Sequence, residues 1–335
     1  MKKILFLTLV LILIFSVTVS IWSWSWGKKK QKNVTLRLGE THPADYPTTK
    51  GDYEFARLVK ERTNGRITIE VFPGKQLGEE KAVIEQVQFG AIDLTRVSVG
   101  PVADFAPKLN ALQLPYLYRD TDHMLKVLQG KIGQDLLKEL ENSQFYGFGW
   151  FDGGTRNFYT TKQPINSIDD MKGLKIRVMQ SEVFVQMIEA LGGVATPLPY
   201  GEVYSALQAG VIDGAENNYP SYDTSSHFEV AKYYTEDGHL RVPEIIIGSK
   251  IALDKKLRKG DIDILKKAAN DALAYQMKLW DEKVKFSKDK VIAAGCKIIT
   301  LSPEKKKAFM DAMKPLYAKQ PMEIQDIVEK IQKVK

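Results

Sequence analysis

Apolar and polar residues follow two different periods in the first part of the chain. Alternation over 34–39 and 66–72 predicts two strands, and apolar residues at helical spacing over 48–63 predict a helix between them. A second helix over 79–89 leads into a short buried strand over 91–94. Strands that alternate with helices indicate βαβ units, so we expect an α/β fold with a largely parallel sheet.

A second βαβ series starts near Phe145. It continues with a strand over 173–178 and with helices over 183–191 and 201–209. The last third of the chain is predicted to be mostly helical, with a long amphipathic stretch over 261–294.

Two hexapeptides repeat a pattern, Gln88-Phe-Gly-Ala-Ile-Asp93 and Gln208-Ala-Gly-Val-Ile-Asp213. In each, a glycine ends a predicted helix and two apolar residues form a short strand before an aspartate. We place the aspartate at the carboxyl end of that strand, the end that faces the ligand crevice in open α/β sheets. The repeat therefore predicts two related lobes that present the same corner to a shared cleft.

The N-terminal segment has the layout of an export signal. Lys2 and Lys3 precede an uncharged run from 4 to 26, and three lysines follow over 28–30. The run is also long enough to span a bilayer, and tryptophans over 22–26 are typical of an interfacial belt. We expect residues 1–26 to be a signal peptide, with an uncleaved anchor as the alternative, and the rest to lie in the periplasm or outside the cytoplasm.

Composition narrows the class of protein. With 335 residues, 44% of them hydrophobic, the chain is too long for one comfortable core and suits two lobes. Its single cysteine, Cys296, excludes an internal disulfide framework and a cysteine-based metal cluster. The net charge of +7 comes from scattered lysines, so we expect no nucleic-acid partner, although the excess favours an anionic ligand.

No catalytic motif is present in the sequence. It has no P-loop, no His-Glu-x-x-His and no Gly-x-Ser-x-Gly pattern, and its four histidines lack metal-ligand spacing. We expect a protein that is not an enzyme and that holds neither a cofactor nor a metal.

Recognition features are dense between residues 150 and 222. Arg156 follows a Gly-Gly-Thr turn and Arg177 lies on a predicted strand, and a guanidinium binds a carboxylate through two parallel charge-assisted hydrogen bonds. Tyr200 stands at the start of a helix, where it could stack on a ligand or cover the core. The turn over 213–218 supplies amides and carboxylates that suit sugar hydroxyls but are also common in turns.

The stretches that carry a family resemblance are Gly74-Lys-Gln-Leu-Gly78, Leu114-Pro-Tyr116, Asp170-Met-Lys-Gly-Leu-Lys-Ile-Arg-Val178 and the block from Pro197 to Asn217. In them the chain resembles the solute-binding proteins of tripartite ATP-independent periplasmic (TRAP) transporters. The resemblance covers essentially the whole chain after residue 26 and implies an α/β two-lobed periplasmic binding protein with crossing strands. It also implies one long helix spanning both lobes, for which 261–294 is the candidate.

The resemblance implies a division of the chain into lobes and a monomeric protein that delivers its ligand to TRAP membrane subunits. Lobe I would comprise 33–152 and about 243–282, and lobe II 153–242 and about 283–335. Closure of the lobes about a hinge would trap the ligand.

Site residues follow from the resemblance position by position. Arg177 would clamp the ligand carboxylate, Arg156 would support it, Asn217 would contact the acid end, and Tyr200 would pack on the ligand. On the first lobe, hydroxyls would be read by the polar side chains of Glu80, Arg96 and His42.

Finer matches over 41–47, 92–98 and 214–222 resemble the branch that binds hexuronates such as glucuronate and galacturonate. A four-carbon dicarboxylate is the second ligand class, and sialic acid is disfavoured because its first-lobe glutamate falls near Ser98. An exported sugar-acid lyase, with His42 or Tyr200 as base, and an anchored sensor remain as alternative functions.

Overall fold

The structure, a computed structural model, describes residues 33–335 and consists of strands and helices joined by short 3₁₀ turns. The export signal expected over 1–26 lies outside the described residues. The strands are β1 (Val34–Gly39), β2 (Ile67–Phe72), β3 (Leu94–Ser98), β4 (Phe145–Thr160), β5 (Lys175–Val178), β6 (Val194–Pro197), β7 (Gly214–Asn217), β8 (Tyr233–Ser249) and β9 (Lys297–Thr300). The helices are α2 (Pro47–Arg62), α3 (Glu80–Gln88), α4 (Val99–Val102), α5 (Thr121–Gln129), α6 (Lys131–Glu139), α7 (Glu182–Ala190), α8 (Val203–Gln208), α9 (Tyr219–Thr224), α10 (His227–Val230), α11 (Lys250–Lys256), α12 (Asp261–Ala293), α13 (Pro303–Met313), α14 (Pro315–Lys319) and α15 (Met322–Lys333).

The strands form one sheet in the order β2-β1-β3-β8-β4-β7-β5-β6, with β9 added beside β8. β1 pairs in parallel with β2 and β3, and β5 pairs in parallel with β6 and β7. The two parallel groups are joined by the antiparallel pair β4 and β8. From either edge inward the sheet therefore has the same pattern, which is three strands in parallel, with the earliest in the chain at their centre, followed by a long crossing strand. This repeated pattern confirms the two related lobes that the sequence predicted.

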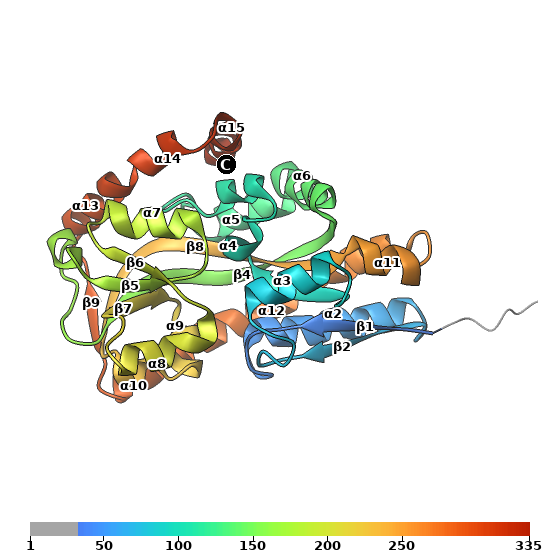
Figure 1. Ribbon diagram of the computed structural model, residues 1–335, viewed down its shortest axis with the longest axis horizontal. Helices are drawn as coiled ribbons and strands as arrows, with labels where there is room; N and C mark the ends of the chain where they lie inside the picture. The colour runs from blue at the N-terminus through green and yellow to red at the C-terminus, as the bar shows by residue number, and fades with distance from the viewer. Residues whose placement is uncertain (1–32) are drawn as a thin grey trace, which may run out of the picture.

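β4 and β8 are long enough to run through both lobes, with 16 and 17 residues. In Figure 1 they cross the middle of the molecule from the lobe of β1 and β2 (lobe I) to the lobe of β5 and β6 (lobe II). The sequence predicted a parallel βαβ start near Phe145, and that prediction was wrong. β4 is antiparallel to both β7 and β8, because it serves as a crossing strand.

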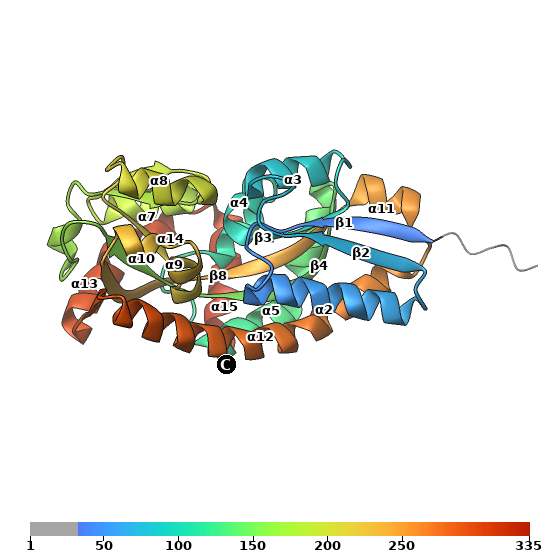
Figure 2. The ribbon, with the colours of Figure 1, turned by 90° about the horizontal axis from the view of Figure 1, so that it is seen from below.

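Helix α12 has 33 residues and runs along both lobes, as the amphipathic stretch over 261–294 predicted (Figure 2). At its first residue Asp261 pairs with Arg66 of lobe I, whose Nη1 lies 2.9 Å from Oδ2. In its second half Ser287 and Lys283 donate to Asp223 of α9 in lobe II, at 2.8 and 3.0 Å. The helix is thus tied to one lobe at each end.

The middle of α12 holds the crossing strand. Pro243 of β8 lies opposite Asp152 of β4 and has no N–H to donate. The buried side chain of Gln276 takes the place of a backbone partner: its Nε2 donates to the carbonyl of Asp152 at 2.9 Å, and its Oε1 accepts from the Asp152 N–H at 3.2 Å. Just beyond this point the register of β4 shifts between Asp152 and Thr155, so the ladder is interrupted where the chain passes between lobes.

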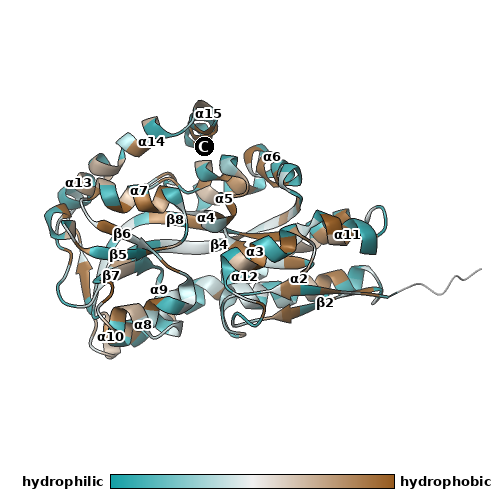
Figure 3. Ribbon diagram, viewed as in Figure 1, coloured by the Kyte–Doolittle hydropathy of each residue, from teal (hydrophilic) through white to brown (hydrophobic). Residues whose placement is uncertain are grey.

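The apolar packing around the sheet is partly confined to one lobe and partly shared by both. In lobe I, Leu36, Phe55 and Phe148 are fully buried between the sheet, α2 and α12. Ile176 and Phe184 of lobe II belong to a cluster that also includes residues of α3 and α6 in lobe I and continues under the C-terminal helices. Figure 3 shows teal and brown residues alternating around helices such as α3 and α7, as amphipathic helices on a sheet require.

The hexapeptide repeat is a structural repeat, but the predicted position of its aspartates was wrong. Asp93 and Asp213 come immediately before β3 and β7, at the amino ends of these strands. Asp93 Oδ2 accepts from the N–H of Arg37 in β1 at 2.9 Å, and Asp213 Oδ2 accepts from the N–H of Lys175 in β5 at 3.0 Å. The apolar residues before them end the turn rather than form the strand, so both carboxylates point away from the crevice.

The C-terminal helix lies with lobe I rather than lobe II. α15 packs on α6 and on the 3₁₀ turn Pro107–Leu112, and the carbonyl of Ile331 lies 3.0 Å from His123 Nε2. A division that gives all of 283–335 to lobe II therefore does not describe α15. Within residues 33–335, none of the helices combines the length and hydrophobicity that a membrane crossing requires.

Gly154 provides a test of the crossing point. Its φ is +71°, and a Cβ there would collide with the indole of Trp280 on α12. We expect Gly154→Ala to lower the free energy of unfolding by about 2 kcal/mol or more, because backbone strain adds to overpacking. Gly210→Ala is the matched control, since its φ is +70° and its Cβ would meet nothing within 4 Å. Equal losses in urea unfolding of the two variants would contradict the close packing of Trp280 on β4.

Candidate functional site

A cavity lies between the two lobes, at the carboxyl ends of the parallel strands of both. Its volume is about 30 Å³, room for roughly two water molecules, so a larger ligand enters only when the lobes part or side chains move. Most of the lining residues are polar or aromatic, and the full set is Thr41, His42, Tyr46, Thr48, Glu80, Ser98, Arg156, Arg177, Met179, Tyr200, Asn217, Asn218, Ser221, Glu244 and Trp280.

Arg177 is a buried cation without a carboxylate partner among residues 33–335. It lies on β5 and is 3% exposed, and its Nε and Nη2 both donate to the carbonyl of Leu198, at 2.9 and 2.6 Å. Burial lowers its pKa, and the neighbouring Arg156 acts in the same direction while Glu216 opposes it. The side chain is thus held in place by a neutral carbonyl, and Nη1 remains to donate to an anion in the cavity.

Arg156, in contrast, is fully paired. Its Nη2 donates to Glu216 Oε1 at 2.8 Å and its Nε donates to Glu216 Oε2. Its Nη1 donates to Asn217 Oδ1 at 3.0 Å, and the N–H of Asn218 donates to the same oxygen at 2.8 Å. Because both neighbours of that atom are donors, the amide orientation of Asn217 is fixed and its Nδ2 is left as a donor for the cavity.

Behind Arg156 lies a buried histidine between two carboxylates. His239 Nδ1 is 2.8 Å from Asp237 Oδ2, and its Nε2 is 3.6 Å from Glu216 Oε2. Burial alone would lower the pKa of His239, but the two carboxylates raise it to about 9. The histidine therefore carries a positive charge at neutral pH and helps to keep Glu216 ionised beside Arg156.

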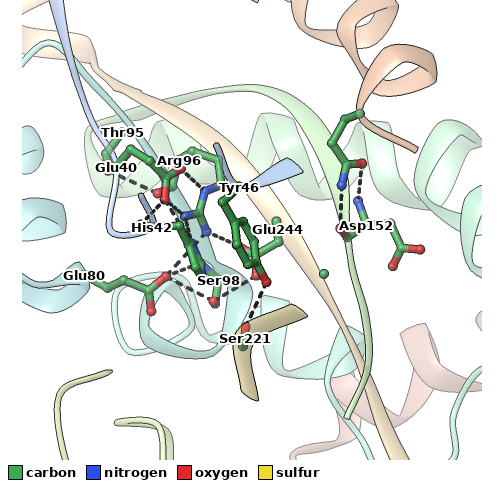
Figure 4. Close-up of polar contacts among 12 residues, drawn as sticks. Glu40, His42, Tyr46, Glu80, Thr95, Arg96, Ser98, Asp152, Ser221 and Glu244 are labelled. Carbon is green, nitrogen blue, oxygen red and sulfur yellow. Dashed lines mark hydrogen bonds and ion pairs between the residues drawn. The ribbon is translucent and has the colours of Figure 1, made fainter. Parts of the chain in front are cut away.

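On lobe I, Arg96 lies behind the wall of the cavity rather than on it. It is fully buried, and it donates through Nε to Glu40 Oε2 at 2.6 Å and through Nη1 to Glu244 (Figure 4). Although burial opposes its charge, these carboxylates raise the pKa of Arg96 well above its ordinary value. Burial also opposes the charge of Glu40, but Arg96 and His42 hold the pKa of Glu40 well below its ordinary value.

Glu80 and Glu244 form the lobe I side of the cavity together with Ser98. Glu80 Oε1 accepts from the N–H of Ser98 at 2.9 Å, and the hydroxyl of Ser98 lies 3.1 Å from an oxygen of each glutamate (Figure 4). Burial and the nearby charge of Glu244 raise the pKa of Glu80. These groups are hydrogen-bond acceptors that suit the hydroxyls of a ligand.

Aromatic rings close the remaining sides. His42 stacks on Tyr46 with ring centroids 4.0 Å apart, and Tyr200 of lobe II lies 5.4 Å from His42. Tyr46 also crosses the cleft, since its hydroxyl lies 2.8 Å from Ser221 Oγ of α9. Trp280 of α12 packs edge-on against Tyr46. Such rings give a sugar ring apolar faces to contact.

The structure brings together most of the side chains that the sequence predicted. Those on the cavity wall are Arg177, Arg156, Asn217, Tyr200, Glu80 and His42. Arg96 is not among the lining residues, because its donors are directed to Glu40 and Glu244.

Sequence reasoning missed several lining residues, above all Glu244. It follows Pro243 and precedes Ile245-Ile-Ile247, and a lone carboxylate in such an apolar strand was a signal that could have been used. Tyr46 and Ser221 lie in the stretches 41–47 and 214–222 that carry the finer resemblance, but they were not singled out there. Trp280 gave no comparable signal, because nothing in its local sequence distinguishes it from a core residue. Among residues 33–335 no group of three or more histidine, cysteine or acidic side chains is placed to hold a metal ion.

Comparison with known proteins places the chain among solute-binding proteins. The sequence model of bacterial extracellular solute-binding protein family 7 (DctP) matches residues 38–323. A solute-binding protein of Chromohalobacter salexigens is 40% identical over 294 residues, which are 87% of this chain and 87% of that protein.

Two solved structures are similar throughout. A TRAP periplasmic solute-binding protein of Bradyrhizobium sp. BTAi1, in complex with α/β-D-galacturonate, is 42% identical with a TM-score of 0.87, over 89% of this chain and 99% of that one. A second, of Pseudomonas putida F1 with bound D-glucuronate, is 40% identical with a TM-score of 0.86, over 90% and 98% of the two chains.

The buried histidine predicts a pH dependence of stability. The folded pKa of His239 is about 9, against about 6.5 in an unfolded chain, so its contribution is fully present below about pH 6.5 and lost as pH rises through 9. We expect the free energy of unfolding of the unmodified protein to exceed that of the His239→Gln variant at about pH 6, and we expect this difference to shrink by about pH 10. Urea unfolding of both proteins across this range measures it, and a difference that stays constant would contradict the charged histidine.

Proposed function

The chain belongs to bacterial extracellular solute-binding protein family 7, and we propose that it captures a hexuronate of the galacturonate or glucuronate type for uptake by a TRAP transporter. It is a solute-binding protein of transport and not an enzyme. The observation that carries the proposed ligand class is the buried guanidinium of Arg177, which faces the cavity without a carboxylate partner among residues 33–335.

A ligand carboxylate at Arg177 would relieve the cost of burying that charge unpaired. Arg96 and Arg156 each lie against glutamates, so their charges are already matched. At Arg177 the matching anion has to come from the ligand, and Asn217 Nδ2 supplies a second donor beside it. The direction of the acid is then set by the guanidinium and the amide together.

The rest of the cavity suits a polyhydroxylated body. Glu80, Ser98 and Glu244 offer acceptors on lobe I, and Tyr200 and Trp280 offer aromatic surface. A hexuronate has both parts, one carboxylate and a ring with several hydroxyls. The related structures with bound galacturonate and glucuronate support this assignment.

Capture is proposed to proceed by closure of the lobes on the ligand, about the crossing point of β4 and β8. The hydrogen bond between Tyr46 and Ser221 joins the lobes across the cleft in the present conformation. The closed form would be the one that the membrane subunits of the transporter engage. We propose that residues 1–26 direct export as a signal peptide or remain as an anchor, and that the protein works outside the cytoplasm as a monomer that binds no nucleic acid.

Ligand binding can be tested directly. We expect the melting temperature of the chain without residues 1–26 to rise with galacturonate or glucuronate, by several degrees at 100 times the dissociation constant, because the ligand binds only the folded state. A screen of uronates, aldonates and four-carbon dicarboxylates measures it. No shift with any uronate would contradict the proposal, and a larger shift with a dicarboxylate would favour the second ligand class. Chemical change of the bound acid on long incubation would indicate a lyase.

The role of Arg177 can be tested by a conservative change. We expect Arg177→Lys to weaken uronate binding by more than about tenfold, because an ammonium lacks the planar fork that binds Leu198 and the ligand at once. Isothermal titration calorimetry gives the dissociation constants. Arg57→Lys, an exposed arginine on α2 paired with Glu54, is the matched control and should bind as the unmodified protein does. An unchanged constant in Arg177→Lys would remove it from the site.

A further inference from the structure

The two walls of the cavity carry opposite charges. Apart from tyrosines, the ionisable lining side chains on lobe II are Arg156 and Arg177, and those on lobe I are Glu80, Glu244 and His42. Arg156 is matched by Glu216, which leaves Arg177 as the unmatched cation of that wall. A ligand that lies across the cavity therefore has one end in a positive environment and the other end among carboxylates.

The carboxylates of lobe I are not fully compensated by Arg96. That guanidinium directs Nε and Nη2 to Glu40 and Nη1 to Glu244. Glu80 receives only a distant contact from it, with 3.8 Å between Oε1 and Arg96 Nη1. One arginine thus serves three glutamates, and His42 Nδ1 lies 3.0 Å from Glu40 Oε1, so that only Nε2 of this ring is left for the cavity.

The remaining partners of Glu80 and Glu244 are neutral donors. Ser98 gives Glu80 its backbone N–H, and its single hydroxyl proton serves either glutamate but not both at once. The two side chains consequently have acceptor capacity left for hydroxyl groups of a ligand. In their ionised form they have no donor that a second carboxylate of a ligand could use.

We propose that Glu80 and Glu244 make the site selective for acids with a single carboxylate, by repelling a second carboxylate at the end of the ligand opposite Arg177. The inference rests on the proposed function, since it takes Arg177 as the carboxylate clamp. It adds that lobe I accepts a hydroxyl and rejects a second carboxylate at the same end of acids that have the same chain length. Charge, rather than size, separates the two classes.

The test uses two open-chain acids that differ at one carbon. Reduction of C1 of D-galacturonate gives L-galactonate, and oxidation of the same carbon gives galactarate, so the clamp carboxylate and the hydroxyls between are shared. We expect galactarate to bind at least about tenfold more weakly than L-galactonate, because like charges in a partly buried site repel strongly. Calorimetric titrations in which each acid competes with bound galacturonate give the dissociation constants of galactarate and L-galactonate.

The variant Glu80→Gln removes one charge and keeps an amide oxygen for Ser98. We expect this variant to reduce the ratio of the dissociation constant of galactarate to that of L-galactonate by about threefold or more. Glu85→Gln is the matched control, because Glu85 is an exposed glutamate on the same helix, α3, and should leave the ratio unchanged. Melting temperatures without ligand show that both variants fold.

Galactarate that binds as well as L-galactonate, a failure of both acids to bind, or a ratio that is unchanged in Glu80→Gln would each overturn this inference. The proposed function has a separate test in the same experiment, which is the binding of galacturonate itself. If galacturonate binds and galactarate binds equally well, only the charge selection is refuted. If galacturonate does not bind, the proposed function is refuted with it.

Discussion

The antiparallel pairing of β4 with β8 is the constraint on which both lobes depend. Each lobe is built outward from this pair by parallel strands, so an error in its register would displace both halves of the cavity. Pro243 and the register shift after Asp152 weaken the ladder at the passage between lobes, and Gln276 of α12 restores the backbone partner lost there. The crossing strands can thus bend at one place while the lobes on either side keep their own hydrogen bonds.

Charge is distributed in the buried region so that only one cation lacks an internal partner among the described residues. Arg96 and Arg156 hold glutamates in place, and a histidinium behind Arg156 adds to that network. Arg177 is held instead by a carbonyl, which fixes its position without neutralising it. Since removing a charge from water is costly unless it is paired, an arrangement of this kind favours an anionic ligand at that position.

The two lobes make different contributions although their topologies match. Lobe II offers donors from the ends of β5 and β7, and lobe I offers acceptors around Ser98. The equivalent aspartates before β3 and β7 show that the repeated element serves the sheet, since each accepts a hydrogen bond from a backbone N–H of the neighbouring strand. Repetition therefore accounts for the framework, and the differences at the carboxyl ends account for recognition.

Local sequence was sufficient for the strands β1, β2 and β5 and for the helices α2, α3 and α12, because burial of one face imposes a period that is visible without tertiary contacts. The resemblance was sufficient to gather six of the cavity residues, including Arg177 and Asn217. The direction of β4, the return of α15 to lobe I and the amino-terminal position of Asp93 depended on pairing between distant segments, which no local pattern records. Tertiary structure alone also separated Arg96, which is turned toward Glu40 and Glu244, from Arg177, which is turned toward the cavity. Both arginines lie on buried strands, and only the carboxylates brought near them by the fold decide which charge is already matched.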